Sequence, residues 1–235
     1  MNTNQSLSII MPIFNEENTI EEILKKLKIL KSSFDTEIII INDGSTDKSK
    51  KIIEDNHTFY SKVYHLKNNQ GKGKAVIEGL KHCTKNYVLI QDADLEYDPI
   101  DILKFMKVNN EFDCDLIMGS RFIGSERSVL NFWHMLGNKF ITFIFNFLNN
   151  TTFSDIYCCY CLFKRKNLDF KKLKCNGWGQ QAEILTHLIN KNSRLFEIGV
   201  KYNGRKYSEG KKIKYYDVFS VTYWIVFTKI KKIFS

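Results

Sequence analysis

Short apolar runs alternate with amphipathic segments along the first half of this chain, and this alternation constrains the fold more than any other feature. The clearest run is TEIIIIND at residues 36–43, which holds four consecutive isoleucines. A strand that is apolar on both faces has to be covered on both faces, which is typical of parallel sheets with helices on either side. The sequence therefore predicts an α/β fold with a mostly parallel central sheet flanked by helices.

The other expected elements follow in order. Strands are predicted at residues 7–12, 62–66, 87–92 and 114–120, and helices at 16–30, 45–56, 71–83 and about 102–108. The second of these helices is expected to begin with Ser45 or Thr46 as its N-cap. We expect one catalytic domain over residues 1–214 and a C-terminal amphipathic helix over residues 215–235.

Polar stretches follow four of the predicted strands at the points where these strands end. Their sequences are PIFNE, NDGS, KNNQGKGK and QDADLE. In open parallel sheets, ligands bind beyond the carboxyl ends of the strands. The four stretches are therefore expected to meet at one edge of the sheet, although they are far apart in the sequence.

Carboxylates are concentrated in the last of these stretches. Asp92, Asp94 and Glu96 can supply oxygen ligands to a hard divalent cation, which keeps water and substrate phosphates as its remaining ligands. Asp98, before a proline, is more typical of a turn or a helix start. Asp43 is either an acceptor for base or ribose hydroxyls or a helix-capping carboxylate, and GKGKA at residues 71–75 offers an anion site at a helix N-terminus.

The chain is basic, with 35 Lys and Arg residues against 26 Asp and Glu, a formal net charge of +9. This favours an anionic partner: nucleic acid, a phosphorylated small molecule or an anionic membrane surface. Residues 201–214 hold six basic residues and one acidic one, although a solvated loop is the usual explanation of such a run. Charge alone supports a nucleic-acid-binding domain, and no DNA- or RNA-binding signature is present, so we expect no nucleic-acid partner.

The six cysteines indicate a reducing compartment, since the N-terminus lacks the basic and apolar regions of a signal peptide. The CCYC run at residues 158–161 lacks the spacing of a structural zinc site. Buried thiols are therefore favoured over a metal site.

Two aromatic segments require a choice between membrane and core. The first, from about residue 131 to 150, is expected to be a helix interrupted at residues 137–139, and the second covers residues 218–234. Both are too short or too polar to span ~30 Å of hydrocarbon. They either lie in the membrane interface, with Trp133, Tyr223 and Trp224 near the headgroups, or pack on the sheet as core helices. The sequence leaves both alternatives open.

Six motifs, in this order and with these separations, give the chain a specific resemblance. They are PIFNEENTI, IIINDGSTDKS, NNQGKGKAVIEG, QDADLEYDP, MGSRF and NGRKYSEGKKI. The set resembles the family 2 glycosyltransferases, and within them the dolichyl-phosphate mannose synthase-like enzymes and their bacterial polyprenyl-phosphate relatives. The resemblance implies an A-type glycosyltransferase fold, a nucleotide-sugar donor and Mg²⁺ or Mn²⁺ as the cofactor.

The resemblance also implies site residues. Those expected to bind the nucleotide sugar are Pro12, Phe14, Glu16, Ile41, Asp43, Asp92, Ala93, Asp94, Arg205 and Lys211. Asp94 and Glu96 would be the metal ligands with Asp92 beside them, and Asp94 and Arg121 would be the catalytic residues. Arg121 would meet the acceptor phosphate, while Arg205 and Lys211 would hold the diphosphate.

The expected reaction is an inverting hexosyl transfer from a donor such as GDP-mannose or UDP-glucose to a polyprenyl or dolichyl phosphate. The enzyme would then lie peripherally on the cytosolic face of a membrane. The chain departs from the pattern of the family it resembles at Cys161. In that family a basic residue usually follows the aromatic residue that corresponds here to Tyr160. Lys164 and Arg165 could compensate, and the alternative is a family 2 transferase that acts on a saccharide hydroxyl in surface polysaccharide synthesis. A hydroxyl acceptor needs a general base, whereas a phosphate is already ionised near pH 7.

Overall fold

The computed structural model describes residues 6–124, 131–205 and 217–234. The strands form a seven-stranded sheet in the order β3-β2-β1-β4-β6-β5-β7. Their bounds are β1 (Ser6–Ile13), β2 (Asp35–Asn42), β3 (Lys62–His65), β4 (Tyr87–Ile90), β5 (Leu116–Ser120), β6 (Cys161–Lys164) and β7 (Leu195–Gly199). Among the strands of the described residues, only β6 runs antiparallel to its neighbours, so the predicted mostly parallel sheet is confirmed.

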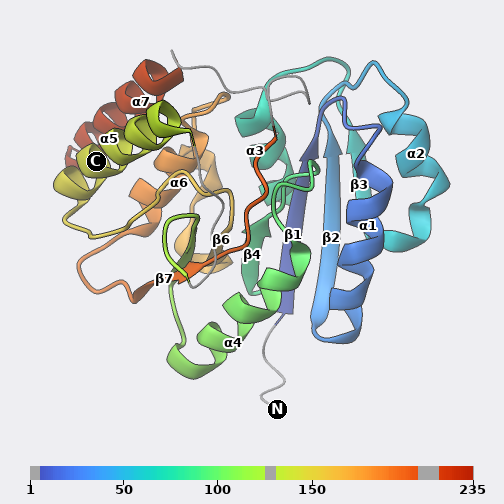
Figure 1. Cartoon of the computed structure of the whole chain (residues 1–235), viewed down its shortest axis with the longest axis horizontal. Coiled ribbons are helices and arrows are strands. Elements are labelled where there is room, and N and C mark those ends of the chain that lie inside the picture. The colour runs from blue at the N-terminus through green and yellow to red at the C-terminus, as the bar shows by residue number, and fades with distance from the viewer. Residues whose placement is uncertain (1–5, 125–130, 206–216, 235) are drawn as a thin grey trace.

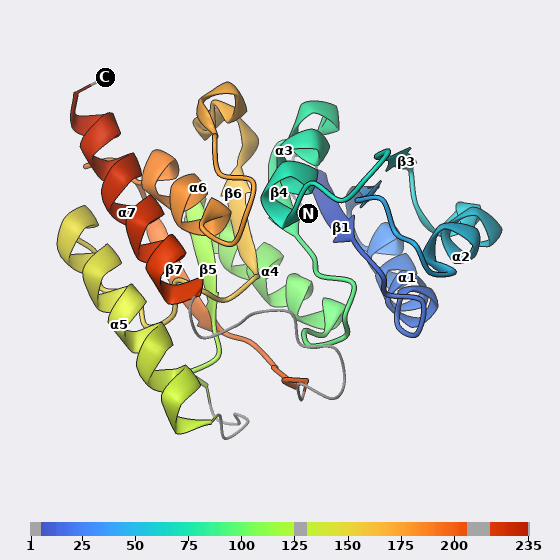
Figure 2. The ribbon, with the colours of Figure 1, turned by 90° about the horizontal axis from the view of Figure 1, so that it is seen from above.

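Helices cover this sheet and extend beyond one end of it (Figure 1). The α-helices are α1 (Ile20–Lys28), α2 (Ser49–Asp55), α3 (Lys72–His82), α4 (Ile102–Phe112), α5 (Phe132–Asn149), α6 (Gln180–Leu188) and α7 (Asp217–Ile233). Short 3-10 helices are η1 (Ile29–Ser32), η2 (His57–Phe59), η3 (Pro99–Asp101), η4 (Arg165–Asn167) and η5 (Phe170–Lys172). Figure 2 shows α5, α6 and α7 grouped at one end of the molecule, with α1 and α2 at the other.

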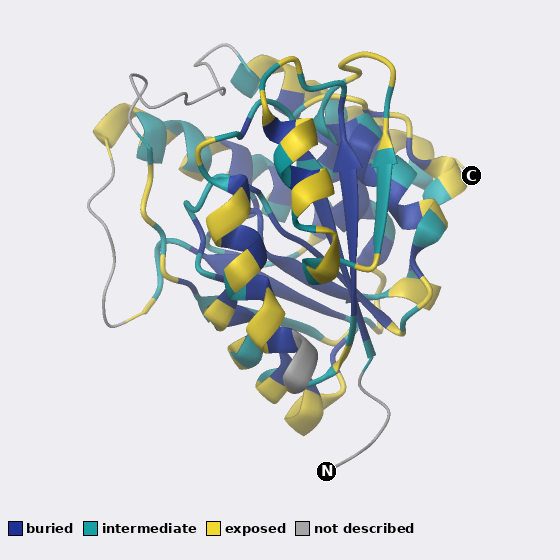
Figure 3. Cartoon of the chain, turned by 90° about the vertical axis from the view of Figure 1, so that its right-hand side faces the viewer, coloured by how far each residue is buried: buried dark blue, intermediate teal, exposed yellow. Residues whose placement is uncertain are grey.

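The core lies between the sheet and these helices. The four isoleucines at positions 38–41 are fully buried, as expected for a strand covered on both faces. Figure 3 shows buried strands at the centre of the molecule, while the helices expose their outer turns. The two edge strands, β3 and β7, are only half-buried. α3 packs closely on β1 because Gly79 has no side chain, and a Cβ there would overlap Ile10. The amphipathic pattern therefore predicted the layers correctly.

Several predicted element boundaries differ from the structure: α1 begins at Ile20 and not at residue 16, and α4 continues to Phe112. Two further predictions, the N-cap of α2 and an interruption of α5, were wrong. α2 begins at Ser49 with Lys48 as its N-cap, because Ser45 and Thr46 instead form hydrogen bonds with Asn15 in the turn after β1. α5 continues without a break through Gly137, where glycine costs about 1 kcal/mol relative to alanine. Packing offsets that cost, since α5 lies against α7 at this point and Gly137 faces Val218. The predicted boundary at residue 214 lies outside the described residues.

Glu37 ties β1, β2 and the turn before β4 together at the amino ends of the strands. Its carboxylate accepts hydrogen bonds of 2.6 Å from Ser8 Oγ and 2.6 Å from the backbone N–H of Thr84, and lies 3.3 Å from Lys62 Nζ. Burial raises the pKa of Glu37, but these hydrogen bonds outweigh it and the pKa is lowered overall. The carboxylate is therefore a stabilising anion far from the carboxyl ends of the strands.

We expect Glu37→Gln to lower the free energy of unfolding by about 2 kcal/mol at pH 7. Because the folded-state pKa is depressed, this stabilisation is present above the unfolded pKa of about 4.3 and is lost as the pH falls through the folded pKa. Urea unfolding from about pH 7 down to about pH 2 should show a constant deficit of the variant above about pH 4.3 and a shrinking deficit below it. Glu21→Gln, which removes an exposed partner of Lys25, is the control and should change stability by less than about 0.5 kcal/mol. An equal loss for both variants would contradict the prediction.

Candidate functional site

A cavity of about 1010 Å³ lies at the carboxyl ends of β1, β2 and β4. All four polar stretches contribute to its wall, so their predicted convergence on one edge of the sheet is present in the structure. The predicted site residues that line it are Pro12, Phe14, Glu16, Asp43, Asp92, Ala93, Asp94, Glu96, Arg121 and Arg205. Ile41 does not line the cavity: it is fully buried in β2, where it pairs with Pro12. Lys211 lies outside the described residues.

Asp43 holds the loop that leads into α3. Its two carboxylate oxygens accept hydrogen bonds of 2.9 Å from the backbone N–H groups of Gln70 and Gly71. Burial raises the pKa of Asp43, which these hydrogen bonds only partly offset. Gly71 has φ of 94°, a conformation that favours glycine. Asp43 is thus a loop-positioning carboxylate on the cavity wall.

A buried ion pair joins the start of α3 to the end of β4. Lys72 Nζ lies 2.6 Å from Asp92 Oδ1, and Cys159 Sγ is 3.8 Å from the same nitrogen. Burial disfavours both charges, but the pairing outweighs it: Asp92 raises the pKa of Lys72, and Lys72 lowers that of Asp92. Both groups are therefore ionised at neutral pH.

Arg205 lies among the remaining carboxylates of the cavity. Its Nη1 is 3.0 Å from Glu16 Oε2 and its Nη2 is 3.0 Å from Asp94 Oδ2. Glu96 Oε1 lies 4.0 Å from Nε and accepts a 2.7 Å hydrogen bond from the backbone N–H of Arg205. One guanidinium therefore faces three carboxylates.

This acidic cluster, defined as Glu16, Asp92, Asp94 and Glu96, has more negative than positive charge. Lys72 and Arg205 oppose its four carboxylates, which leaves a formal excess of two negative charges when all are ionised. Burial, and next the neighbouring Asp92 and Glu96, raise the pKa of Asp94 to about 7. An additional cation would relieve this repulsion.

The donor atoms of the acidic cluster suit a hard divalent cation, which prefers carboxylate oxygens. Within the described residues, however, no group of three or more His, Cys, Asp or Glu side chains is arranged as a metal site. Asp92 forms an ion pair with Lys72, while Asp94 and Glu96 lie beside the guanidinium of Arg205. The carboxylate oxygens therefore fit the predicted Mg²⁺ or Mn²⁺. In this structure the same carboxylates form ion pairs with Lys72 and Arg205.

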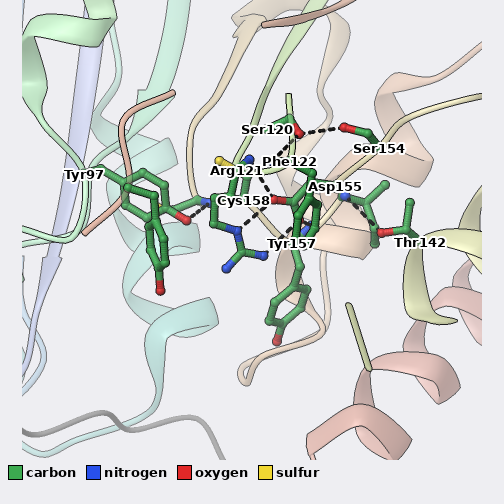
Figure 4. A network of polar contacts seen from close by, with 12 residues as sticks. Tyr97, Ser120, Arg121, Phe122, Thr142, Ser154, Asp155, Tyr157 and Cys158 are labelled. Carbon is green, nitrogen blue, oxygen red and sulfur yellow. Dashed lines mark hydrogen bonds and ion pairs between the residues drawn. The ribbon is translucent and has the colours of Figure 1, made fainter. Parts of the chain in front are cut away.

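Arg121 follows β5 and forms the second charged centre of the cavity (Figure 4). Its Nε and Nη2 lie 2.7 and 2.9 Å from the two oxygens of Asp155, and its backbone N–H donates to the same carboxylate at 3.1 Å. Burial alone would lower the pKa of Arg121, yet the Asp155 carboxylate holds it well above its ordinary value. The guanidinium also lies 5.2 Å from the ring centroid of Tyr202.

Several residues of the site were not predicted. Tyr202 donates a 3.1 Å hydrogen bond to Glu96, and Thr19 donates one of 2.7 Å to the carbonyl of Ala93. Lys72 was expected only as part of an anion-binding helix start, not as the partner of Asp92. The aromatic part of the wall includes Trp133, Tyr157, Trp178 and Phe219. No local sequence pattern marks Thr19, Tyr157, Trp178 or Tyr202 as site residues, because the fold brings them to the site from separate segments.

The cavity extends from the acidic cluster to the aromatic helices α5 and α7. Each of these helices buries one side, with Phe145 and Ile225 fully buried, and exposes the other. The exposed apolar residues, which we call the aromatic face, are Phe132, Trp133, Leu136, Phe140, Phe143, Phe147, Phe219, Tyr223, Val226, Phe227, Ile230, Ile233 and Phe234. The sequence left open whether these helices pack in the core or expose an apolar surface. In the structure each helix does both: one side packs in the core, and the opposite side is exposed. In the described parts of the chain, no helix is long and apolar enough to cross a membrane.

Lys164 and Arg165 lie at the opposite end of the sheet, so they cannot compensate for Cys161. β6 is antiparallel to β4, which places Lys164 beside Tyr87 at the start of β4, where it pairs with Asp113 at 2.9 Å. Cys161 is buried in β6 and is not part of the cavity wall. All six cysteines are buried free thiols, as predicted.

Comparison with known proteins gives a family match over most of the chain. Residues 8–170 match the model of the family described as glycosyl transferase family 2. The glycosyltransferase AglJ of Haloferax volcanii is 26% identical over 206 residues, which cover 87% of this chain and 65% of that protein. A dolichyl-phosphate beta-glucosyltransferase of Trichomonas vaginalis is 28% identical over 217 residues, which cover 84% of this chain and 65% of that protein. The chain thus spans just under two thirds of the length of these two relatives.

A solved structure supports the fold. The crystal structure of glucosyl-3-phosphoglycerate synthase of Mycobacterium tuberculosis is similar with a TM-score of 0.71 and 15% sequence identity, covering 97% of this chain and 80% of that chain. Other crystal structures of that synthase contain Mn²⁺ with UDP-glucose and phosphoglyceric acid, or Mg²⁺ with UDP. The predicted A-type glycosyltransferase fold is confirmed.

Proposed function

The chain belongs to glycosyl transferase family 2, and from that premise we propose that it transfers a hexose from a nucleotide-diphosphate sugar to a polyprenyl or dolichyl phosphate, with inversion at the anomeric carbon. The donor would be of the GDP-mannose or UDP-glucose type. The observation that carries the proposal is the lining of the cavity, which includes the acidic cluster, Arg121 and Arg205 and also Trp133 of α5 and Phe219 of α7. A charged sugar donor and an apolar acceptor chain need these two environments side by side.

Asp94 and Glu96, with Asp92 beside them, would hold Mg²⁺ or Mn²⁺ together with the donor diphosphate. When bound, the ion would neutralise negative charge that develops on the departing diphosphate. Arg205 would add to that stabilisation, because its guanidinium faces the same cavity. Pro12, Phe14 and Asp43 would line the nucleotide end. The divalent cation is supported by the excess negative charge of the acidic cluster.

Arg121 would bind the acceptor phosphate at the other end of the charged part. Its pairing with Asp155 fixes the orientation of the guanidinium, so that the phosphate meets a preorganised cation. A phosphate oxygen near pH 7 is already ionised and attacks the anomeric carbon without losing a proton. The reaction would therefore need no general base.

The aromatic face suits a peripheral position on the cytosolic side of a membrane. Exposed contiguous apolar surface of this kind marks interaction sites, and Phe147 and Phe219 are 79% and 77% exposed. Because the aromatic part of the cavity includes Trp133 and Phe219 of this face, a lipid could pass from the bilayer into the site. The dolichyl-phosphate activity named for the Trichomonas vaginalis relative supports the same acceptor class.

Replacing Phe143 and Phe147 together by serine should weaken binding to phosphatidylcholine–phosphatidylglycerol vesicles by about tenfold or more, because two exposed phenyl rings leave the interface. Vesicle co-sedimentation measures the partition coefficient, and the melting temperature checks the fold. Ile29→Ser removes an exposed apolar side chain at the opposite end of the molecule and should leave partitioning unchanged. Equal partitioning of the double variant and the parent would remove these residues from the membrane contact.

The proposed activity is tested by incubating the protein with labelled GDP-mannose or UDP-glucose, a polyprenyl phosphate and Mg²⁺ or Mn²⁺. We expect label in the lipid fraction with one of the donors. A thermal-shift panel of GDP- and UDP-sugars identifies the donor beforehand, because a ligand that binds only the folded state raises the melting temperature. Absence of lipid-linked product from every donor that binds would rule out the lipid-phosphate acceptor.

A second acceptor class is favoured by one observation, the buried Cys161 in place of a basic residue, with Lys164 and Arg165 at the far end of the sheet. In that case the acceptor would be a saccharide hydroxyl, as in surface polysaccharide synthesis. Transfer to a soluble glycan, with none to lipid phosphate, would support this alternative. The reverse result would eliminate it.

A further inference from the structure

We propose that Arg205 acts as a resident cation of the acidic cluster, so that a divalent cation has to displace its guanidinium before the guanidinium can bind the donor diphosphate. This inference rests on the proposed use of a metal ion and a nucleotide sugar. It predicts how the two ligands affect each other: Arg205 competes with the metal for the carboxylates, and once released it helps to bind the nucleotide.

The guanidinium holds the groups that a metal would use. Its Nη2 lies 3.0 Å from Asp94 Oδ2, its Nη1 lies 3.0 Å from Glu16 Oε2, and Glu96 lies 4.0 Å from its Nε. A divalent cation bound to Asp94 and Glu96 would draw on the same oxygens. It would also repel the guanidinium, because two like charges at such short range repel strongly where the effective dielectric is well below that of water. The metal and the guanidinium therefore cannot both keep these contacts.

The fit of the guanidinium is incomplete, which makes it replaceable. Its Nε is buried yet has no hydrogen-bond partner among the described residues. A buried donor that has lost its water and gained no partner destabilises the arrangement that buries it. Lys72 differs in this respect, because both oxygens of Asp92 lie within 2.9 Å of its Nζ. Of the two side-chain cations beside the acidic cluster, Arg205 is therefore the one that gains from release, because its Nε can then find a hydrogen-bond partner.

The backbone before Arg205 stays attached to the site when the side chain leaves. Asn203 donates a 2.8 Å backbone hydrogen bond to the carbonyl of Glu96, and Tyr202 pairs with Tyr97 in an isolated β-bridge. A released guanidinium would thus remain beside the cavity that it already lines. There it would meet the diphosphate, which supplies the oxygens that the metal has taken away.

The consequence is a thermodynamic coupling between metal and nucleotide. The metal frees Arg205 for the diphosphate, so it raises the affinity for the nucleotide, and by reciprocity the nucleotide raises the affinity for the metal. Without the guanidinium, the metal loses a competitor and the nucleotide loses a partner. Removal of Arg205 should therefore change the two affinities in opposite directions, which loss of an ordinary ligand-binding residue would not do.

The test compares the parent with Arg205→Gln in two equilibrium measurements. Binding of Mn²⁺ alone is followed by the electron paramagnetic resonance signal of free Mn²⁺, and binding of UDP and of GDP at saturating Mn²⁺ by calorimetry. We expect Arg205→Gln to bind Mn²⁺ alone about tenfold more tightly and the nucleotide about tenfold more weakly. Arg165→Gln removes an exposed arginine at the far end of the sheet and should change neither affinity. Arg205→Lys, which keeps the charge, should keep the weaker Mn²⁺ binding of the parent.

Unchanged or weaker Mn²⁺ binding by Arg205→Gln would overturn the inference, and so would the absence of Mn²⁺ binding by both proteins. Failure of the proposed function looks different. If no donor and acceptor pair gives product while Arg205→Gln still binds Mn²⁺ more tightly, the competition stands and the proposed reaction falls. Unchanged melting temperatures would show that the variants are folded.

Discussion

Asp94→Asn is expected to reduce the rate of hexosyl transfer by a hundredfold or more, on the order of 3 kcal/mol in the activation barrier. Asp94 lies at the centre of the acidic cluster, within 3.0 Å of Arg205 and two residues from both Asp92 and Glu96. The amide keeps the size of the side chain but removes the charge that would hold the metal and the diphosphate. The turnover number at saturating donor, acceptor and Mn²⁺ is the measurement.

Asp98→Asn is the matched control for this variant. Asp98 belongs to the same acidic stretch, but its carboxylate accepts a 3.1 Å hydrogen bond from the backbone N–H of Ile100 and caps η3, as the sequence predicted for a helix-start residue. This substitution should leave turnover within about twofold of the parent, because a cap stabilises by only about 1 kcal/mol and lies outside the cavity wall. A near-normal rate for Asp94→Asn would remove Asp94 from the proposed metal site.

The sheet was predictable where its strands are apolar on both faces. The isoleucines of β2 and the run YVLI of β4 leave no exposed side, so the sequence pattern and the burial agree. The same rule does not find β7, whose five residues are all half-buried, and α6 was missed as well. The antiparallel direction of β6 depends on chain connections that no local pattern records.

The sequence predicted most of the residues that line the site, but it did not predict which of them contact one another. The carboxyl ends of the strands bring Glu16, Asp43 and Asp94 to one cavity, which follows from the parallel topology. The ion pairs that join Lys72 to Asp92 and Arg205 to Asp94 span 20 and 111 residues. Pairings over such distances are fixed by the packing of the whole chain, so the sequence suggested a diphosphate partner for Arg205 without showing the carboxylates it holds.

The ion pair between Arg121 and Asp155 has two roles. It orients the proposed acceptor-phosphate residue, and it contributes to the stability of the fold. Arg121 follows β5 and Asp155 lies between α5 and β6, so their ion pair joins two segments 34 residues apart. Asp155 is fully buried, and the side chain of Arg121 is 9% exposed. A buried ion pair contributes little net stability when formed, but removal of one partner leaves the other charge without compensation.

We therefore expect Asp155→Ala to lower the free energy of unfolding by about 3–5 kcal/mol, because it leaves the Arg121 guanidinium buried and unpaired. Urea unfolding at pH 7 measures the loss. Arg121→Met combined with Asp155→Ala removes both charges and should be less destabilised than Asp155→Ala alone, although it lacks the proposed phosphate contact. A loss below about 1 kcal/mol for Asp155→Ala would be typical of an exposed pair and would contradict the structural role of this ion pair.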